Sequence, residues 1–156
     1  MSAPATAERR SGNKGRRRDS YDGGVAQYYA EELEAAEARL QETVEARPHD
    51  LDALYLLART KWKRKDLKGA LQTFQRLLSE KPDFASALTD MAQLLLEGLN
   101  NAQGAERFSK RAIEADPLYA PAHVLLGNSQ HAQGDSGRAF DSYNEALRIN
   151  PRLVDP

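Results

Sequence analysis

The 156-residue sequence contains no cysteine, and this absence excludes disulfide bonds and metal sites built on thiolates. No apolar run reaches the roughly 18 residues that a membrane-spanning helix needs. The charged N-terminus is not followed by the apolar segment of a signal peptide. These absences favour, by default, a cytoplasmic protein without a membrane span.

The motifs of catalysis and cofactor binding are also missing. The sequence has no glycine-rich phosphate loop and no HExxH zinc motif. His123 and His131 lie about 80° from a common helix face, so they make a poor metal pair. The glutamates between Glu31 and Glu45 indicate a solvated helix face rather than a catalytic carboxylate pair. We therefore expect no enzyme, no cofactor and no metal site.

The net charge of −1 conceals an uneven distribution. Residues 1–18 contain six Lys and Arg side chains and one Glu, so this arm carries a charge of +5 and the rest of the chain carries −6. Residues 1–24 have no periodic apolar positions, and we expect a disordered basic tail. Such a tail can contact nucleic acid or anionic lipid. Because no aromatic residues are interleaved with its charges, we expect a solubilising tail and no nucleic-acid partner.

Proline recurs at a nearly constant interval along the rest of the chain. Pro48, Pro82, Pro117 and Pro151 are separated by 34, 35 and 34 residues, which is the signature of a repeat array. Apolar residues at spacings of three and four between these prolines indicate paired amphipathic helices. We expect helix pairs at residues 51–64 and 67–80, 84–97 and 102–115, and 119–132 and 135–149. The middle unit has one additional residue within GLNNAQG, residues 98–104.

Alignment of the units on their prolines brings equivalent residues into register. One position holds Asp66, Asn101 and Asp135. A side-chain oxygen at this position can accept a hydrogen bond from the free backbone N–H groups that begin each second helix. The preceding position holds Lys65, Asn100 and Gly134. Gly and Asn tolerate the left-handed backbone conformation that ends a helix, and Lys fits it less well.

This pattern resembles the tetratricopeptide repeat (TPR) family over residues 51–153. The family's small residue, where two helices cross closely, corresponds to Ala58, Ala92 and Gly127, and its later alanine to Ala70, Ala105 and Ala139. Its aromatic position holds Phe74 and Tyr143, but Ser109 in the middle repeat, with Phe108 one place earlier. The resemblance implies an all-α fold, a TPR-like α-solenoid of three helix–turn–helix repeats with an N-terminal capping helix.

This interpretation divides the chain into three segments. Residues 1–24 form the basic tail, residues 25–47 an N-terminal helix that serves as a half-repeat or cap, and residues 48–156 the three repeats. The repeats span about residues 51–84, 85–119 and 120–153. Terminal units of such arrays are expected to be atypical.

The resemblance also implies a concave groove that binds a peptide or a helix of a partner. The matching positions are Tyr55, Arg59, Trp62, Lys63, Gln93, Leu96, Asn128 and His131. Aromatic residues and arginine are enriched at binding hot spots, and the first repeat supplies both. The surrounding basic run, RTKWKRKDLK, indicates an acidic or carboxylate-bearing partner. The alternative is that Trp62 packs against the N-terminal helix and the lysines are solvated.

We therefore expect a scaffold or adaptor for protein–protein interactions. One alternative is a bacterial assembly factor or specialised chaperone, similar to the TPR domains of cytochrome c maturation or to secretion chaperones. Another is a regulatory interaction arm of a separate enzyme.

The last helix carries Phe140, Tyr143 and Leu147, and only residues 152–156 follow Pro151. This is too few for the additional helix that usually covers the last hairpin of such arrays. We expect the uncovered face to be a site of self-association, as a homodimer, or of partner binding.

Overall fold

The structure, a computed structural model, describes residues 29–154, which form helices and no strand. A first helix covers residues 29–46 and is called the N-terminal helix below. Three hairpins follow: α2 (Leu51–Lys63) with α3 (Leu67–Glu80), α4 (Ala85–Gln93) with α5 (Ala102–Ala115), and α6 (Ala120–Ala132) with α7 (Ser136–Ile149). A π-helix, η1 (Leu94–Gly98), continues α4, and a 3-10 turn, η2 (Pro151–Val154), follows α7.

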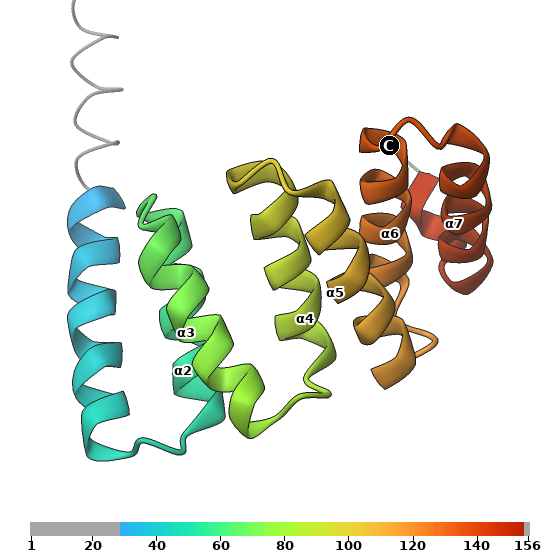
Figure 1. The fold of residues 1–156 in the computed structure, drawn as a ribbon. Coiled ribbons are helices and arrows are strands. Elements are labelled where there is room, and N and C mark those ends of the chain that lie inside the picture. Colours follow the sequence, from blue (N-terminus) through green and yellow to red (C-terminus); the bar gives the residue numbers. More distant parts are fainter. Residues whose placement is uncertain (1–28, 155–156) are drawn as a thin grey trace, which may run out of the picture.

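The hairpins stand side by side in a single row (Figure 1), with the N-terminal helix at one end and α7 at the other. The all-α solenoid predicted from the sequence is therefore confirmed. The predicted basic tail, and the start of the N-terminal helix at residue 25, lie outside the described residues.

Each second helix begins at the capping residue that the repeat register predicts. The side chains of Asp66, Asn101 and Asp135 accept hydrogen bonds from the backbone N–H three residues later, at 2.9, 2.8 and 3.0 Å. These bonds satisfy donors that have no partner inside the helix. The prediction of these three caps is confirmed.

The residue before each cap adopts a left-handed backbone conformation. The φ angles are 68° at Lys65, 51° at Asn100 and 84° at Gly134. This conformation costs a residue with a Cβ roughly 1–2 kcal/mol, so Gly134 suits it and Lys65 does not. Lys65 adopts it nevertheless, because the cap at Asp66 and the start of α3 require the same turn in every repeat.

The additional residue of the middle repeat is absorbed where its first helix ends. In the outer repeats, the N–H of the cap residue donates to a carbonyl five residues earlier, from Asp66 to Lys61 and from Asp135 to Gln130. In the middle repeat, the N–H of Asn101 donates to the carbonyl of Leu95, six residues earlier. The prediction of an α-helix through residue 97 is therefore wrong for its last turn, which widens into the π-helix η1.

Small residues allow the two helices of each hairpin to pack closely. Ala58, Ala92 and Ala105 are fully buried. A Cβ on Gly127 would lie 2.5 Å from a ring carbon of Tyr143, so only glycine permits this contact. The largest buried side chains, among them Phe74, form a core that runs along the array.

The N-terminal helix packs against the first hairpin. Val44 is buried, and Leu40 packs against the core. Arg64, at the end of α2, forms ion pairs with Glu37 and Glu34. This helix therefore covers one end of the described array.

Candidate functional site

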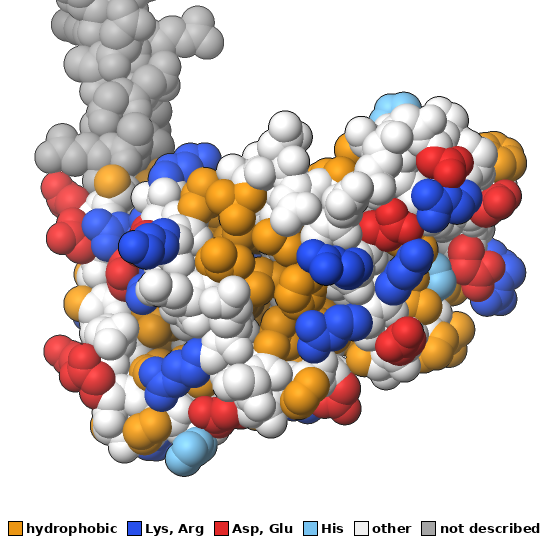
Figure 2. Space-filling view, viewed as in Figure 1, with side chains coloured by type: hydrophobic (Ala, Val, Ile, Leu, Met, Phe, Trp, Pro, Cys, Tyr) orange, Lys and Arg blue, Asp and Glu red, His pale blue; other side chains and the backbone are white. Residues whose placement is uncertain are grey.

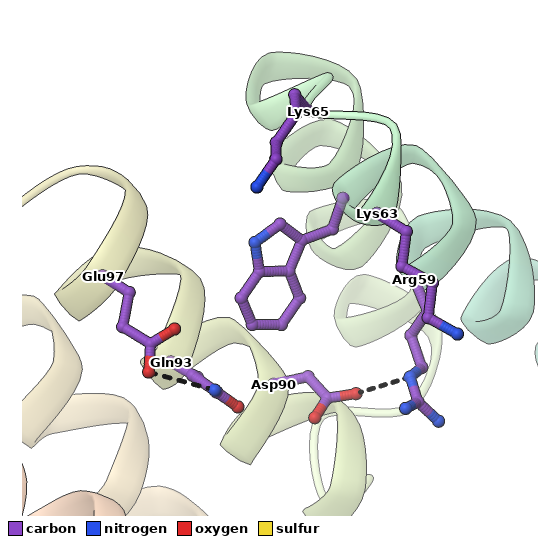
Figure 3. A pocket seen from close by; sticks show the side chains of 7 residues that line it. Arg59, Lys63, Lys65, Asp90, Gln93 and Glu97 are labelled. Carbon is purple, nitrogen blue, oxygen red and sulfur yellow. Dashed lines mark hydrogen bonds and ion pairs between the residues drawn. The ribbon is translucent and has the colours of Figure 1, made fainter. Parts of the chain in front are cut away.

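A pocket of about 360 Å³ lies between the end of α2 and the continuous helix α4–η1. Its lining consists of Arg59, Trp62, Lys63, Lys65, Asp90, Gln93 and Glu97. In Figure 3 the labelled basic side chains come from α2 and the turn that follows it, and Asp90, Gln93 and Glu97 come from the facing helix. The first helices of two adjacent hairpins therefore contribute to one site.

Three side chains of α2 reach the pocket because of their spacing. Trp62 and Lys63 follow Arg59 by three and four residues, and residues at these spacings share one face of a helix. The other face of α2 is buried, including Leu54 and Leu57. Trp62 is partly buried and packs against the core, so the protein holds its indole in place at the pocket wall.

Asp90 is held by contacts within the protein. Its carboxylate accepts a hydrogen bond from the Tyr55 hydroxyl at 2.7 Å, and Nε of Arg59 lies 3.6 Å from the same oxygen. Burial raises the pKa of Asp90, and the Tyr55 hydrogen bond and the charge of Arg59 oppose that rise. Burial and the bond to Asp90 also raise the pKa of Tyr55, so the hydroxyl stays protonated and remains a donor.

Two of the cations in the pocket have no partner of their own. Lys63 and Lys65 make no side-chain hydrogen bond or ion pair within residues 29–154. Arg59 keeps most of its hydrogen-bonding capacity, because only one of its five N–H donors faces Asp90. On the facing side, Gln93 donates to the Glu97 carboxylate at 3.1 Å. The pocket therefore offers unpaired positive charge beside the indole of Trp62.

The structure brings together half of the groove residues proposed from the sequence. Arg59, Trp62, Lys63 and Gln93 line the pocket. Tyr55 lies behind it, with its ring against Phe84 at a centroid distance of 5.3 Å and its hydroxyl on Asp90.

The other proposed groove residues lie elsewhere. Leu96 packs against the core. Asn128 accepts a hydrogen bond from the Tyr143 hydroxyl at 2.7 Å. His131 is exposed in the last turn of α6, away from the residues that line the pocket.

The residues proposed for the C-terminal face differ in their surroundings. Phe140 is 65% exposed. Tyr143 faces α6, with its ring against Gly127, so it does not belong to an outward face. Leu147 is partly buried. After α7 the described chain forms only the short 3-10 turn η2, in which the N–H of Leu153 donates to the carbonyl of Asn150.

Three further residues line the pocket: Lys65, which belongs to the basic run, and Asp90 and Glu97, which the TPR resemblance also places at groove-facing positions. Lys65 reaches the pocket from the left-handed turn after α2, as Figure 3 shows. Asp90 and Glu97 are three and four residues from Gln93, so all three share one face of the helix.

The described residues contain neither a cluster suited to a metal ion nor a membrane-spanning helix. No group of three or more His, Asp or Glu side chains there is placed to hold a metal ion. None of the helices described is long and apolar enough to cross a membrane.

The fold and the pocket define a class of protein, an α-solenoid of helical hairpins with a site between the first helices of neighbouring repeats. Family models described as tetratricopeptide repeat match residues 28–94 and residues 89–153. The chain belongs to the tetratricopeptide repeat family. A search of curated proteins finds no match.

Solved structures of TPR proteins share the fold. A crystal structure of MamA has a TM-score of 0.71 at 16% identity, covering 80% of this chain and 72% of that one. A double mutant, MamA RS-1 ArsTM, gives 0.69 at 19% identity, with coverages of 87% and 76%. TTC0263, a thermophilic TPR protein of Thermus thermophilus, gives 0.67 at 25% identity, with coverages of 82% and 71%.

Proposed function

We propose that the protein is an interaction scaffold that holds a peptide or helix of a protein partner in the pocket between α2 and α4, and that it acts by binding rather than by catalysis. The observation that carries this proposal is the convergence of Trp62 with Arg59, Lys63 and Lys65 in one open pocket. Membership of a repeat family of interaction scaffolds supports it. The roles of assembly factor and of regulatory arm stay predictions.

The pocket favours a ligand with an apolar group next to a carboxylate. The indole of Trp62 supplies a large apolar surface whose position is fixed by the core, so little side-chain entropy is lost on binding. Lys63 and Lys65 are free to pair with an acid. Asp90 repels a ligand carboxylate only weakly, because its charge is already opposed by Arg59.

Trp62 makes this proposal directly testable, because it is the single tryptophan of the chain. Its fluorescence reports on the pocket alone. A partner recovered by pull-down should shift or quench this emission as it saturates the protein. Trp62→Ala should weaken binding by about 2 kcal/mol or more, as expected for a central aromatic anchor, when measured by calorimetry.

A charge reversal in the pocket can be compared with a change elsewhere on the surface. Lys63→Glu should weaken the binding of an acidic partner and Asn144→Ala, on the exposed surface of α7, should leave it unchanged. If Trp62→Ala, Lys63→Glu and Asn144→Ala all bind the partner equally while their circular dichroism stays helical, the assignment of this pocket is wrong.

A further inference from the structure

The gap between α5 and α7 is filled by polar side chains of the protein itself. Glu106 is 8% exposed, and its carboxylate is occupied by neighbouring side chains. It accepts hydrogen bonds from Gln133 at 2.5 Å and from Arg138 at 3.1 Å, and Nζ of Lys110 lies at 2.9 Å. Ser142 donates to the buried side-chain oxygen of Gln130 at 2.7 Å. We call this region the closed junction.

The equivalent gap between α3 and α5 has none of these groups. In the repeat register Leu71 stands in the place of Glu106, and Phe108 in the place of Ser142. The two donors from the next hairpin are also missing. Leu99 stands in the place of Gln133, two residues before the cap, and Gly104 stands in the place of Arg138. The side chains that seal the closed junction are thus replaced by three apolar residues and one glycine.

The gap between α3 and α5 carries an apolar strip, which we define as Leu67, Leu71, Gly98, Gly104 and Phe108. Its three larger side chains are partly exposed. A Cβ on Gly98 would lie 3.4 Å from the Leu67 side chain, so η1 lies directly beside α3. Figure 2 shows hydrophobic side chains gathered between α3 and the α4–α5 hairpin. They lie on the face of the molecule formed by the second helices, α3 and α5.

Positive charge borders the apolar strip on the α5 side. Arg107 and Arg111 are exposed and four residues apart, so they share one face of α5, and Arg111 lies three residues after Phe108. The guanidinium of Arg111 lies 5.1 Å from the centre of the Phe108 ring. Lys and Arg side chains flank the hydrophobic area in Figure 2. None of the residues of the strip is acidic.

We propose that the apolar strip docks an acidic amphipathic helix of a protein partner, on a face separate from the pocket at Trp62. The rim of arginines selects the charge of the occupant. The occupant is expected to be a helix, because the backbone groups of α3 and α5 are already paired within those helices. An extended peptide would find no backbone partners there, whereas a helix brings its own hydrogen bonds and buries only side chains.

Three synthetic peptides test this docking site. All carry one leucine stripe at helical spacing, and their polar faces hold Glu, Gln or Lys. Each is labelled with fluorescein and titrated with the full chain by anisotropy. The Glu peptide should bind best, about tenfold or more tighter than the Lys peptide at low salt, and this advantage should shrink as salt is added.

Variants that fill the strip or remove its aromatic side chain should weaken the binding of the Glu peptide. Leu71→Glu with Gly104→Arg transplants the Glu106–Arg138 pair of the closed junction into the strip. Because a side chain at residue 104 crowds the cap Asn101, Phe108→Ser is a second variant that leaves the cap intact. Each should weaken the Glu peptide about tenfold or more, as loss of a buried anchor does. Phe140→Glu changes the residue equivalent to Leu71 in the last repeat and should have no effect.

Other outcomes overturn the proposal. If the Glu and Lys peptides bind equally, or if Phe108→Ser binds the Glu peptide as wild type does, the strip is not a docking site for an acidic helix. A dimer in sedimentation that the closing variants dissociate would make a second copy the occupant. The pocket is tested separately: Trp62→Ala should leave the affinity for the Glu peptide unchanged, and a loss there would assign this peptide to the pocket instead.

Discussion

The closed junction between α5 and α7 and the apolar strip between α3 and α5 occupy equivalent places in the repeat array but have different chemistry. At the closed junction, Glu106 and the donors from the next hairpin satisfy one another inside the chain. At the strip, Leu71 and Phe108 pack against the core and stay partly exposed. The repeat fold tolerates both, because it depends on the small residues between helices and on the caps rather than on this outer position.

The comparison explains why an aromatic residue in the middle repeat lies one place earlier. Phe74 in α3 is fully buried, and its equivalent in α5 is Ser109, which is also fully buried. The hydroxyl of Ser109 donates to the carbonyl of Ala105 at 2.8 Å, so this polar group needs no other partner. The aromatic side chain that leaves the core is Phe108, and it joins the apolar strip. A shift of one residue along the helix thus places the aromatic side chain at the partly exposed strip instead of at the fully buried position.

The largest expected effect separates these two aromatic residues. Phe74→Ala should destabilise the protein by about 3–5 kcal/mol, since it empties a fully buried site. Phe108→Ala should cost only about 1–2 kcal/mol, because the side chain buries less area. Urea unfolding followed by circular dichroism measures both. Equal losses would show that Phe108 is a core residue and that the strip is not available for docking.

Placing leucine, the residue found at the equivalent position of the strip, at residue 106 should lower the stability of the protein. Glu106→Leu removes an acceptor shared by Gln133 and Arg138, although Gln133 keeps its bond to the carbonyl of Ser129 and Arg138 its pair with Asp135. We expect a loss of about 0.5–1.5 kcal/mol. Leu71→Glu makes the opposite exchange at a site without an arginine and should cost less, because the new carboxylate can reach water. Chemical denaturation of the two variants gives the comparison. If Leu71→Glu loses more stability than Glu106→Leu, Leu71 is not open to water and the strip is as closed as the other junction.

The two junctions should also differ in their dependence on pH. Hydrogen bonds from Lys110 and Gln133 lower the pKa of Glu106 below its ordinary value of 4.5. A carboxyl group whose pKa is lowered by folding stabilises the protein above its unfolded pKa, and this contribution is lost as pH falls through the folded pKa. Wild type should therefore exceed Glu106→Gln in stability at neutral pH, by about 1 kcal/mol. The difference should narrow below pH 4.5.

The control for the pH experiment lies in the strip, where no carboxylate is present. The stability difference between wild type and Phe108→Ser should stay constant over the same pH range. If the Glu106→Gln difference is also flat, the ion network at the closed junction contributes no net stability.

Much of the fold was predictable because it is encoded locally. The prolines fixed the period, and the caps at Asp66, Asn101 and Asp135 set where helices begin. The π-turn at residues 94–98 was not predictable, because an additional residue can widen a helix or lengthen a loop at similar cost. Lys65 is a similar case, because the demands of the turn outweighed its own preference.

The candidate site was predictable only where one helix determines it. Spacing along α2 was enough to group Arg59 with Trp62 and Lys63. The pairing of Tyr55 with Asp90 joins residues 35 apart in the sequence, and it depends on how neighbouring hairpins rotate against each other. The same is true of the strip. The register puts Leu71 and Glu106 at equivalent positions, but only the residues across the gap decide which position is sealed.

The smallest expected effect concerns the third residue of that register, Phe140. It is 65% exposed, so Phe140→Glu should change the free energy of unfolding by less than about 0.5 kcal/mol. It also tests the self-association proposed for the C-terminal face, to which Leu153 adds a side chain 46% exposed. If this face pairs with a second copy, light scattering at micromolar concentration should show a dimer that Phe140→Glu dissociates while Phe108→Ser does not. A monomer in both variants and in wild type would remove self-association and leave the pocket and the strip as the two interaction surfaces.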